Sequence, residues 1–165
     1  MRILRHPATW LVAALVVAAG LYLFQPWRLF TTVVVNEAAP VATATASAAA
    51  QPTTKVLSSG NFVTHEHATT GKAKVLQLPD GKRVLRIEDL ATSDGPDLRV
   101  WLSDQPVTDQ WHTFDDGRYV ELGELKGNKG NANYAIPASA DLAKLRSVTI
   151  WCRRFSVSFG AAALA

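Results

Sequence analysis

Cysteine is almost absent from the sequence: Cys152 is the only one among 165 residues. A lone cysteine cannot form a disulfide within the chain, so the fold cannot depend on a disulfide framework. An unpaired thiol in an exported protein indicates either pairing with another chain or a free reactive group. The alternative is a thiol that only packs, since free cysteine is among the most buried residue types.

An excess of positive charge is also missing from most of the chain. The whole sequence has 17 Lys and Arg against 14 Asp and Glu, but from Val56 onward each class numbers 13. The surplus therefore lies in the N-terminal third, in Arg2, Arg5, Arg28 and Lys55 against Glu37. A nucleic-acid-binding protein needs a basic face. No such face is visible, so no nucleic-acid partner is expected.

Motifs of common enzymes are absent as well. The sequence has no Gly-x-Ser-x-Gly, no His-Glu-x-x-His and no Cys-x-x-Cys. The aspartates between residues 94 and 116 do not have the spacing of an EF-hand calcium loop. No acid–base pair stands out, and no metal site is assigned. We therefore do not expect a classical enzyme.

A long uncharged segment lies near the N-terminus, where 22 residues separate Arg5 from Arg28. A helix over residues 7–27 would approach the thickness of a hydrocarbon core, about 30 Å. Trp10 and Tyr22 lie where aromatic residues meet the membrane interface. The pattern predicts a single transmembrane helix that anchors the protein in the cell membrane.

The same segment has a second interpretation, a cleaved signal peptide, because a positive start and an apolar core fit both. However, the small residues at 38–44 lie far beyond the apolar core, and residues 25–28 make a poor cleavage site. We therefore expect an uncleaved anchor. Because Arg2 and Arg5 precede it, residues 1–6 are predicted to be cytoplasmic and the domain extracytoplasmic.

Residues 28–55 are predicted to form a juxtamembrane segment and a flexible linker. Ala, Thr, Ser and Pro dominate residues 36–54, a composition typical of an extended tether. From residue 56 to 165 the pattern changes to short alternating runs between turns such as Asp80-Gly81. Seven or eight strands at this spacing predict an all-β domain, either an antiparallel β-sandwich or a barrel-like domain.

Cys152 ends one of the predicted strands, on the same face as Val148 and Ile150. These apolar neighbours favour a buried, inert thiol. Arg153 and Arg154 follow at once, and nearby cations favour the thiolate, which is the reactive form. The pattern leaves both interpretations open.

His65 and His67 flank a single residue, Glu66. In an extended strand the two imidazoles would lie on one face, where they could provide two ligands to a metal or a haem. Two ligands do not make a complete site, however. Histidines of a polar loop are the commoner case.

Several short stretches, taken in order, resemble the DM-thirteen domain, a family described as electron-transfer. The resemblance extends over about residues 60–164. The stretches that carry it include Gly60-x-Phe62, Leu85-Arg86-Ile87-Glu88, Asp94-Gly95-Pro96-Asp97-Leu98, Val100-Trp101-Leu102-Ser103 and Val148-x-Ile150-Trp151-Cys152-x-x-Phe155.

The resemblance implies an extracytoplasmic β-rich module in which Cys152 takes part in redox chemistry, as a bare thiol or through a prosthetic group such as haem. His65 and His67 would then be candidate cofactor ligands, and Arg153 and Arg154 would tune the thiolate. An electron circuit also needs a redox partner protein in trans.

The alternative is a non-catalytic binding or structural module at the cell surface. It would contact a partner protein or a glycan through exposed side chains such as Trp101 or Trp111.

Overall fold

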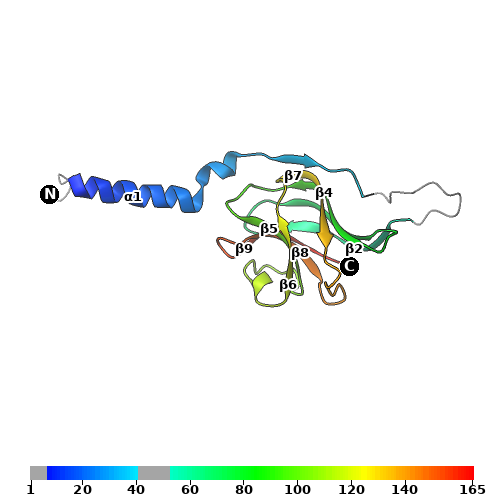
Figure 1. Cartoon of the computed structure of the whole chain (residues 1–165). Coiled ribbons are helices and arrows are strands. Elements are labelled where there is room, and N and C mark those ends of the chain that lie inside the picture. The colour runs from blue at the N-terminus through cyan, green and yellow to red at the C-terminus, as the bar shows by residue number, and fades with distance from the viewer. Residues whose placement is uncertain (1–6, 41–52) are drawn as a thin grey trace.

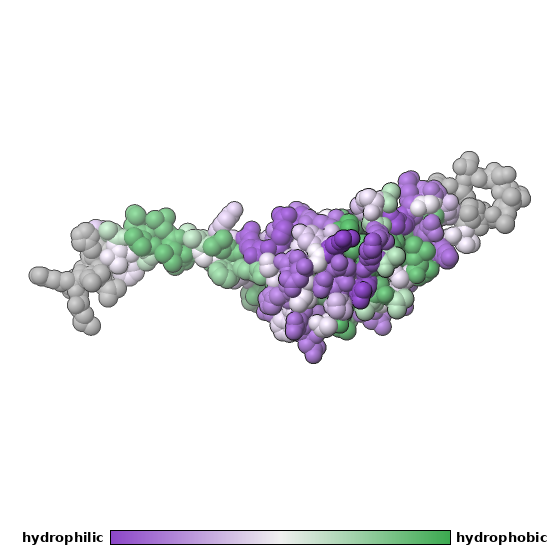
Figure 2. All heavy atoms as spheres, turned by 90° about the horizontal axis from the view of Figure 1, so that it is seen from below, coloured by the Kyte–Doolittle hydropathy of each residue, from purple (hydrophilic) through white to green (hydrophobic). Residues whose placement is uncertain are grey.

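The computed structural model of the chain describes residues 7–40 and 53–165. The chain begins with helix α1 (Pro7–Phe24), which projects away from the β domain (Figure 1). Among the described residues it is the one helix with the length and hydropathy of a membrane span, features that a signal sequence shares. Figure 2 shows an apolar surface along α1 and a mainly polar surface on the domain. The apolar side chains of α1 therefore do not pack into a core.

The described residues after α1 form a 3-10 helix, η2 (Pro26–Phe30), and one curled sheet of nine strands. The strands are β1 (Val34–Asn36), β2 (Lys55–Thr64), β3 (Thr70–Gln77), β4 (Arg83–Ala91), β5 (Leu98–Ser103), β6 (Tyr119–Glu124), β7 (Lys129–Ile136), β8 (Ser147–Cys152) and β9 (Val157–Ala163). Their order in the sheet is β1-β7-β4-β3-β2-β9-β8-β5-β6. All neighbours pair antiparallel except β1 and β7. The predicted all-β, barrel-like fold after one apolar helix is confirmed.

Strand β2 joins the two halves of the sheet. Its first part pairs with β3 up to Asn61, and its last part pairs with β9 from Phe62 onward. Apolar side chains of both halves point into the curl and form the main core, which includes Leu85, Ile150 and Cys152. The change of partner along β2 therefore curls one sheet around one core.

A second, smaller apolar cluster lies on the outer face of β5, β8 and β9. It consists of Trp101, Phe114, Trp151 and Ala161. Phe114 comes from η3 (Thr113–Asp115) in the connection between β5 and β6. Because this connection covers the outer face, β8 is buried at all six of its positions.

The structure differs from the predicted linker over residues 28–40. Val34–Asn36 forms an edge strand on β7, and the Val33 amide donates a hydrogen bond to Asn128 Oδ1 at 2.7 Å. The Glu37 carboxylate accepts hydrogen bonds from Lys126 Nζ at 2.7 Å and from the Asn133 amide at 2.6 Å. Composition could not reveal this, because the partners lie about 95 residues further along the chain. Residues 41–52 of the predicted linker, and residues 1–6, lie outside the described residues.

Candidate functional site

Cys152 lies at the end of β8, between Leu98 of β5 and Val157 of β9. Its side chain is 0% exposed and belongs to the main core. The inward direction follows from the period of two along β8, which also turns Val148 and Ile150 into the core. Of the two interpretations from the sequence, the structure shows the buried thiol.

The surroundings of Cys152 favour the protonated thiol. Burial raises the pKa of Cys152, and the backbone N–H groups of Phe155 and Arg154 offset only part of this effect. The sulfur is therefore a neutral thiol near pH 7. This environment does not favour a solvent-exposed, nucleophilic thiolate.

Arg153 and Arg154 are both held by partners other than the sulfur. Arg153 Nε donates to Asp97 Oδ2 at 3.1 Å. Arg154 Nη1 donates to the carbonyl oxygens of Tyr22 and Leu23, both at 3.0 Å. The last carbonyls of a helix lack partners and carry partial negative charge, so a cation is favourable there. Arg153 thus pairs with a carboxylate, and Arg154 caps the C-terminal end of α1.

His65 lies in the outer apolar region, next to the second cluster. It is 5% exposed, and its ring centroid lies 6.3 Å from that of Trp111 and 5.8 Å from that of Phe114. The Nδ1 atom lies 2.8 Å from Ser158 Oγ, whereas the buried Nε2 has no hydrogen-bond partner among the described residues. Burial lowers the pKa of His65, so the imidazole is neutral near pH 7.

His67 packs elsewhere, with its ring centroid 3.9 Å from that of Phe159. Burial lowers the pKa of His67 too. Strand β2 ends at Thr64 and the chain bends over residues 65–67. The alternation of an extended strand therefore does not continue, and the two imidazoles do not meet.

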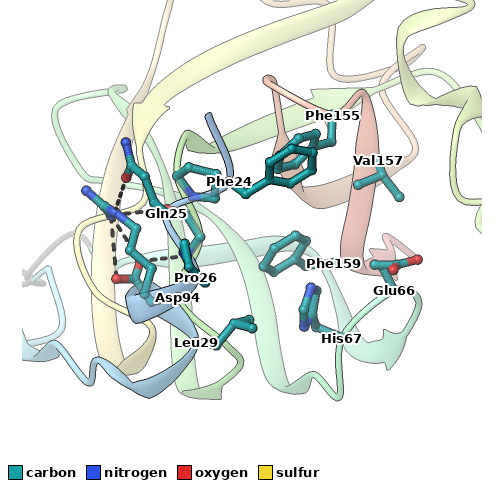
Figure 3. A pocket seen from close by; sticks show the side chains of 13 residues that line it. Phe24, Gln25, Pro26, Leu29, Glu66, His67, Asp94, Phe155, Val157 and Phe159 are labelled. Carbon is teal, nitrogen blue, oxygen red and sulfur yellow. Dashed lines mark hydrogen bonds and ion pairs between the residues drawn. The ribbon is translucent and has the colours of Figure 1, made fainter. Parts of the chain in front are cut away.

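His67 lines a cavity of about 430 Å³ where α1 meets the domain (Figure 3). The end of α1 and the start of η2 are held on one side of this cavity, because Phe24 stacks on Phe155 with ring centroids 5.4 Å apart and Arg28 pairs with Asp94 at 3.3 Å. The lining residues are Phe24, Gln25, Pro26, Arg28, Leu29, Glu66, His67, Asp94, Gly95, Pro96, Phe155, Val157 and Phe159. Val157 lines the cavity, but its strand partner Cys152 does not.

Cys152, His65 and His67 consequently do not form a common ligand set. The sulfur is enclosed in the main core, His65 lies on the outer side, and only His67 reaches the cavity. Among the described residues, no three His, Cys, Asp or Glu side chains gather as metal ligands. A haem held jointly by Cys152 and a histidine does not fit this arrangement.

An aromatic stack on the outer face has no counterpart among the predictions from the sequence. Trp101 lies between Tyr119, with ring centroids 4.0 Å apart and planes at 6°, and Trp151, at 5.1 Å and 26°. The Trp101 indole N–H donates to the Glu121 carboxylate at 3.3 Å. The prediction of an exposed Trp101 is wrong, since it is 3% exposed. Alternation did place Trp101 outward, but it could not show that Phe114 and Tyr119 cover that face.

Comparison with known proteins identifies the family to which the chain belongs. The model of the family described as Electron transfer DM13 matches residues 61–164. This is more than half of the chain, and it includes Cys152 and the aromatic stack. No curated protein and no solved structure matches the chain. The chain therefore belongs to the Electron transfer DM13 family.

Proposed function

We propose that the protein is an electron-transfer module that α1 holds, uncleaved, on the extracytoplasmic side of the cell membrane, with the thiol of Cys152 as its redox group. Family membership supports the redox role. The apolar helix and the arginines before it support the anchor and its orientation. The electron partner is a second protein, in trans.

The observation that carries this proposal is the match of the electron-transfer family over residues 61–164, which contain Cys152. The complete enclosure of Cys152 then distinguishes between two kinds of redox chemistry. Thiol–disulfide exchange requires a thiolate to reach the partner's sulfur, and an enclosed thiol with a raised pKa is unsuited to that. Electron transfer over a short distance requires no such contact. The geometry therefore favours one-electron chemistry over disulfide exchange.

In the proposed half-reaction the Cys152 thiol releases one electron, its proton passes to water, and the sulfur becomes a radical. The electron goes to a one-electron acceptor, such as an oxidised metal centre of the partner. Return of one electron and one proton restores the thiol, so the cycle changes no other bond.

Voltammetry of the full chain in phospholipid nanodiscs tests the role of Cys152. We expect a one-electron signal in the wild type, distinct from the signals of its tyrosines and tryptophans, that is lost in Cys152→Ala. The small, apolar alanine avoids leaving a polar group unpaired in the core, and circular dichroism checks that the variant folds. An identical signal in both proteins would disprove the role of the thiol.

The membrane orientation is tested by labelling intact cells with an amine reagent that does not cross membranes. The side chains of Lys82 and Lys144 are 78% and 62% exposed, so both should react. Mass spectrometry of the purified full-length chain locates the labels and shows whether α1 is retained. Labelling of these lysines only after lysis would contradict the proposed orientation.

A further inference from the structure

The aromatic stack forms a continuous path from the surface of the domain to the residue beside Cys152. Tyr119 is 45% exposed, whereas Trp101 and Trp151 are 3% and 1% exposed. Their rings succeed one another at centroid distances of 4.0 Å and 5.1 Å. Such distances are typical of rings in direct contact. Trp151 precedes Cys152 in β8, so one peptide unit links the end of the stack to the cysteine.

The chemistry of these side chains distinguishes the stack from ordinary aliphatic packing. Phenol and indole rings are, with thiolates, the protein side chains that lose one electron most readily. A ring that has lost one electron can readily take an electron from another ring in contact with it. A buried tryptophan radical cation is far more acidic at its ring N–H than the neutral indole and therefore needs a proton acceptor.

Glu121 occupies the position of that acceptor. One of its carboxylate oxygens lies 3.3 Å from Nε1 of Trp101, and the other accepts from Arg99 Nη1 at 3.4 Å. Arg99 is also held by Asp97 at 2.8 Å. The carboxylate is thus fixed against the one indole that lies in the middle of the stack.

We propose that Tyr119, Trp101 and Trp151 are the route by which electrons leave and enter the domain, with Glu121 as the proton acceptor of Trp101. The inference rests on the proposed function, because it gives a path to a thiol that has no exposed surface. It places the docking site of the redox partner over Tyr119, on the edge strand β6. The partner is a protein that carries a one-electron metal centre.

The step is balanced as follows. The oxidised metal centre accepts one electron from Trp101 through the ring of Tyr119 and is reduced. The N–H proton of Trp101 moves to the carboxylate of Glu121, which leaves a neutral indolyl radical and a carboxylic acid. One electron from the Cys152 thiol, passed through Trp151, restores the indole as Glu121 returns the proton, and the thiol releases its own proton to water.

Flash photolysis of the full chain in nanodiscs tests the route. The probe is tris(bipyridine)ruthenium, which light and a soluble quencher convert to the ruthenium(III) oxidant. We expect a long-lived neutral tryptophan radical, seen by transient absorption and electron paramagnetic resonance. The radical is lost in Trp101→Phe and retained in the control Trp111→Phe, whose indole lies outside the stack. Tyr119→Leu should slow its formation.

Glu121→Gln separates electron transfer from packing. The amide can still accept the hydrogen bond of Trp101 but does not take its proton, so the radical should remain a cation with a distinct absorption spectrum. An unchanged spectrum in Glu121→Gln, or an unchanged radical yield in Trp101→Phe, would overturn the route and leave the stack as packing.

Cys152→Ala separates this inference from the proposed function. If the thiol feeds electrons into the stack, the radical should live longer in Cys152→Ala than in the wild type. A radical that forms normally but has the same lifetime in both proteins would support the route and disprove the role of Cys152.

Discussion

Replacing Trp151 with alanine is expected to lower the free energy of unfolding by about 3–5 kcal/mol, as for other buried tryptophans. Trp151 is 1% exposed, and its ring lies 5.1 Å from that of Trp101 and 6.3 Å from that of Phe114. The substitution leaves a cavity between these rings and removes the contact that holds Phe114 over the sheet. Domains are stable by only about 5–15 kcal/mol, so the loss is a large fraction of the total.

Denaturant unfolding of the full chain in detergent, followed by circular dichroism, measures this loss. The control is Phe155→Ala, an aromatic truncation at a residue that is 41% exposed, for which we expect a loss below about 1 kcal/mol. Hydrogen exchange adds a local readout, since the backbone around Phe114 should exchange faster in Trp151→Ala. Equal losses in the two variants would show that the outer cluster contributes little to stability.

Features that depend on neighbouring residues could be predicted from the sequence. Alternation identified β5 and β8, and the turn at Asp80-Gly81 follows from the positive φ that Gly81 adopts, +81°. The same alternation placed Cys152 with Val148 and Ile150, which correctly describes the inward side of β8. Local patterns therefore gave the fold class, and they included the buried environment of the thiol as one of two alternatives.

Features that depend on distant segments could not be predicted. Arg154 follows Cys152 directly, yet its partners are carbonyls at the end of α1, more than 130 residues earlier. His65 and His67 lie in a bend of the chain, and no typical turn residue in the sequence indicates this bend. The covering of Trp101 depends on where Phe114 packs. Pairings of this kind are set by the closure of the whole sheet rather than by local propensity.

Replacing Gly60 with alanine is expected to lower the free energy of unfolding by about 3 kcal/mol, the upper part of the range for overpacked sites. Gly60 pairs with Ala73 where β2 passes from one half of the sheet to the other. A Cβ at this position would lie 1.8 Å from the carbonyl oxygen of Ala163. Because the obstacle is backbone, β9 must move away from β2, and no side-chain rotation can relieve the contact.

The matched control is Gly81→Asn, because among the described residues no atom beyond its chain neighbours lies within 4 Å of a Cβ at Gly81 and asparagine tolerates positive φ in turns. We expect Gly81→Asn to lower the free energy of unfolding by less than about 1 kcal/mol. Gly60→Ala should also affect Cys152, since β9 carries Val157, the strand partner of Cys152 in the main core. If alkylation of Cys152 requires the domain to open, a decrease of about 3 kcal/mol in the free energy of unfolding should raise the rate of alkylation roughly a hundredfold. Faster unfolding without faster alkylation would mean that the thiol is reached by a path other than the opening of β9, and its enclosure would no longer argue for one-electron chemistry.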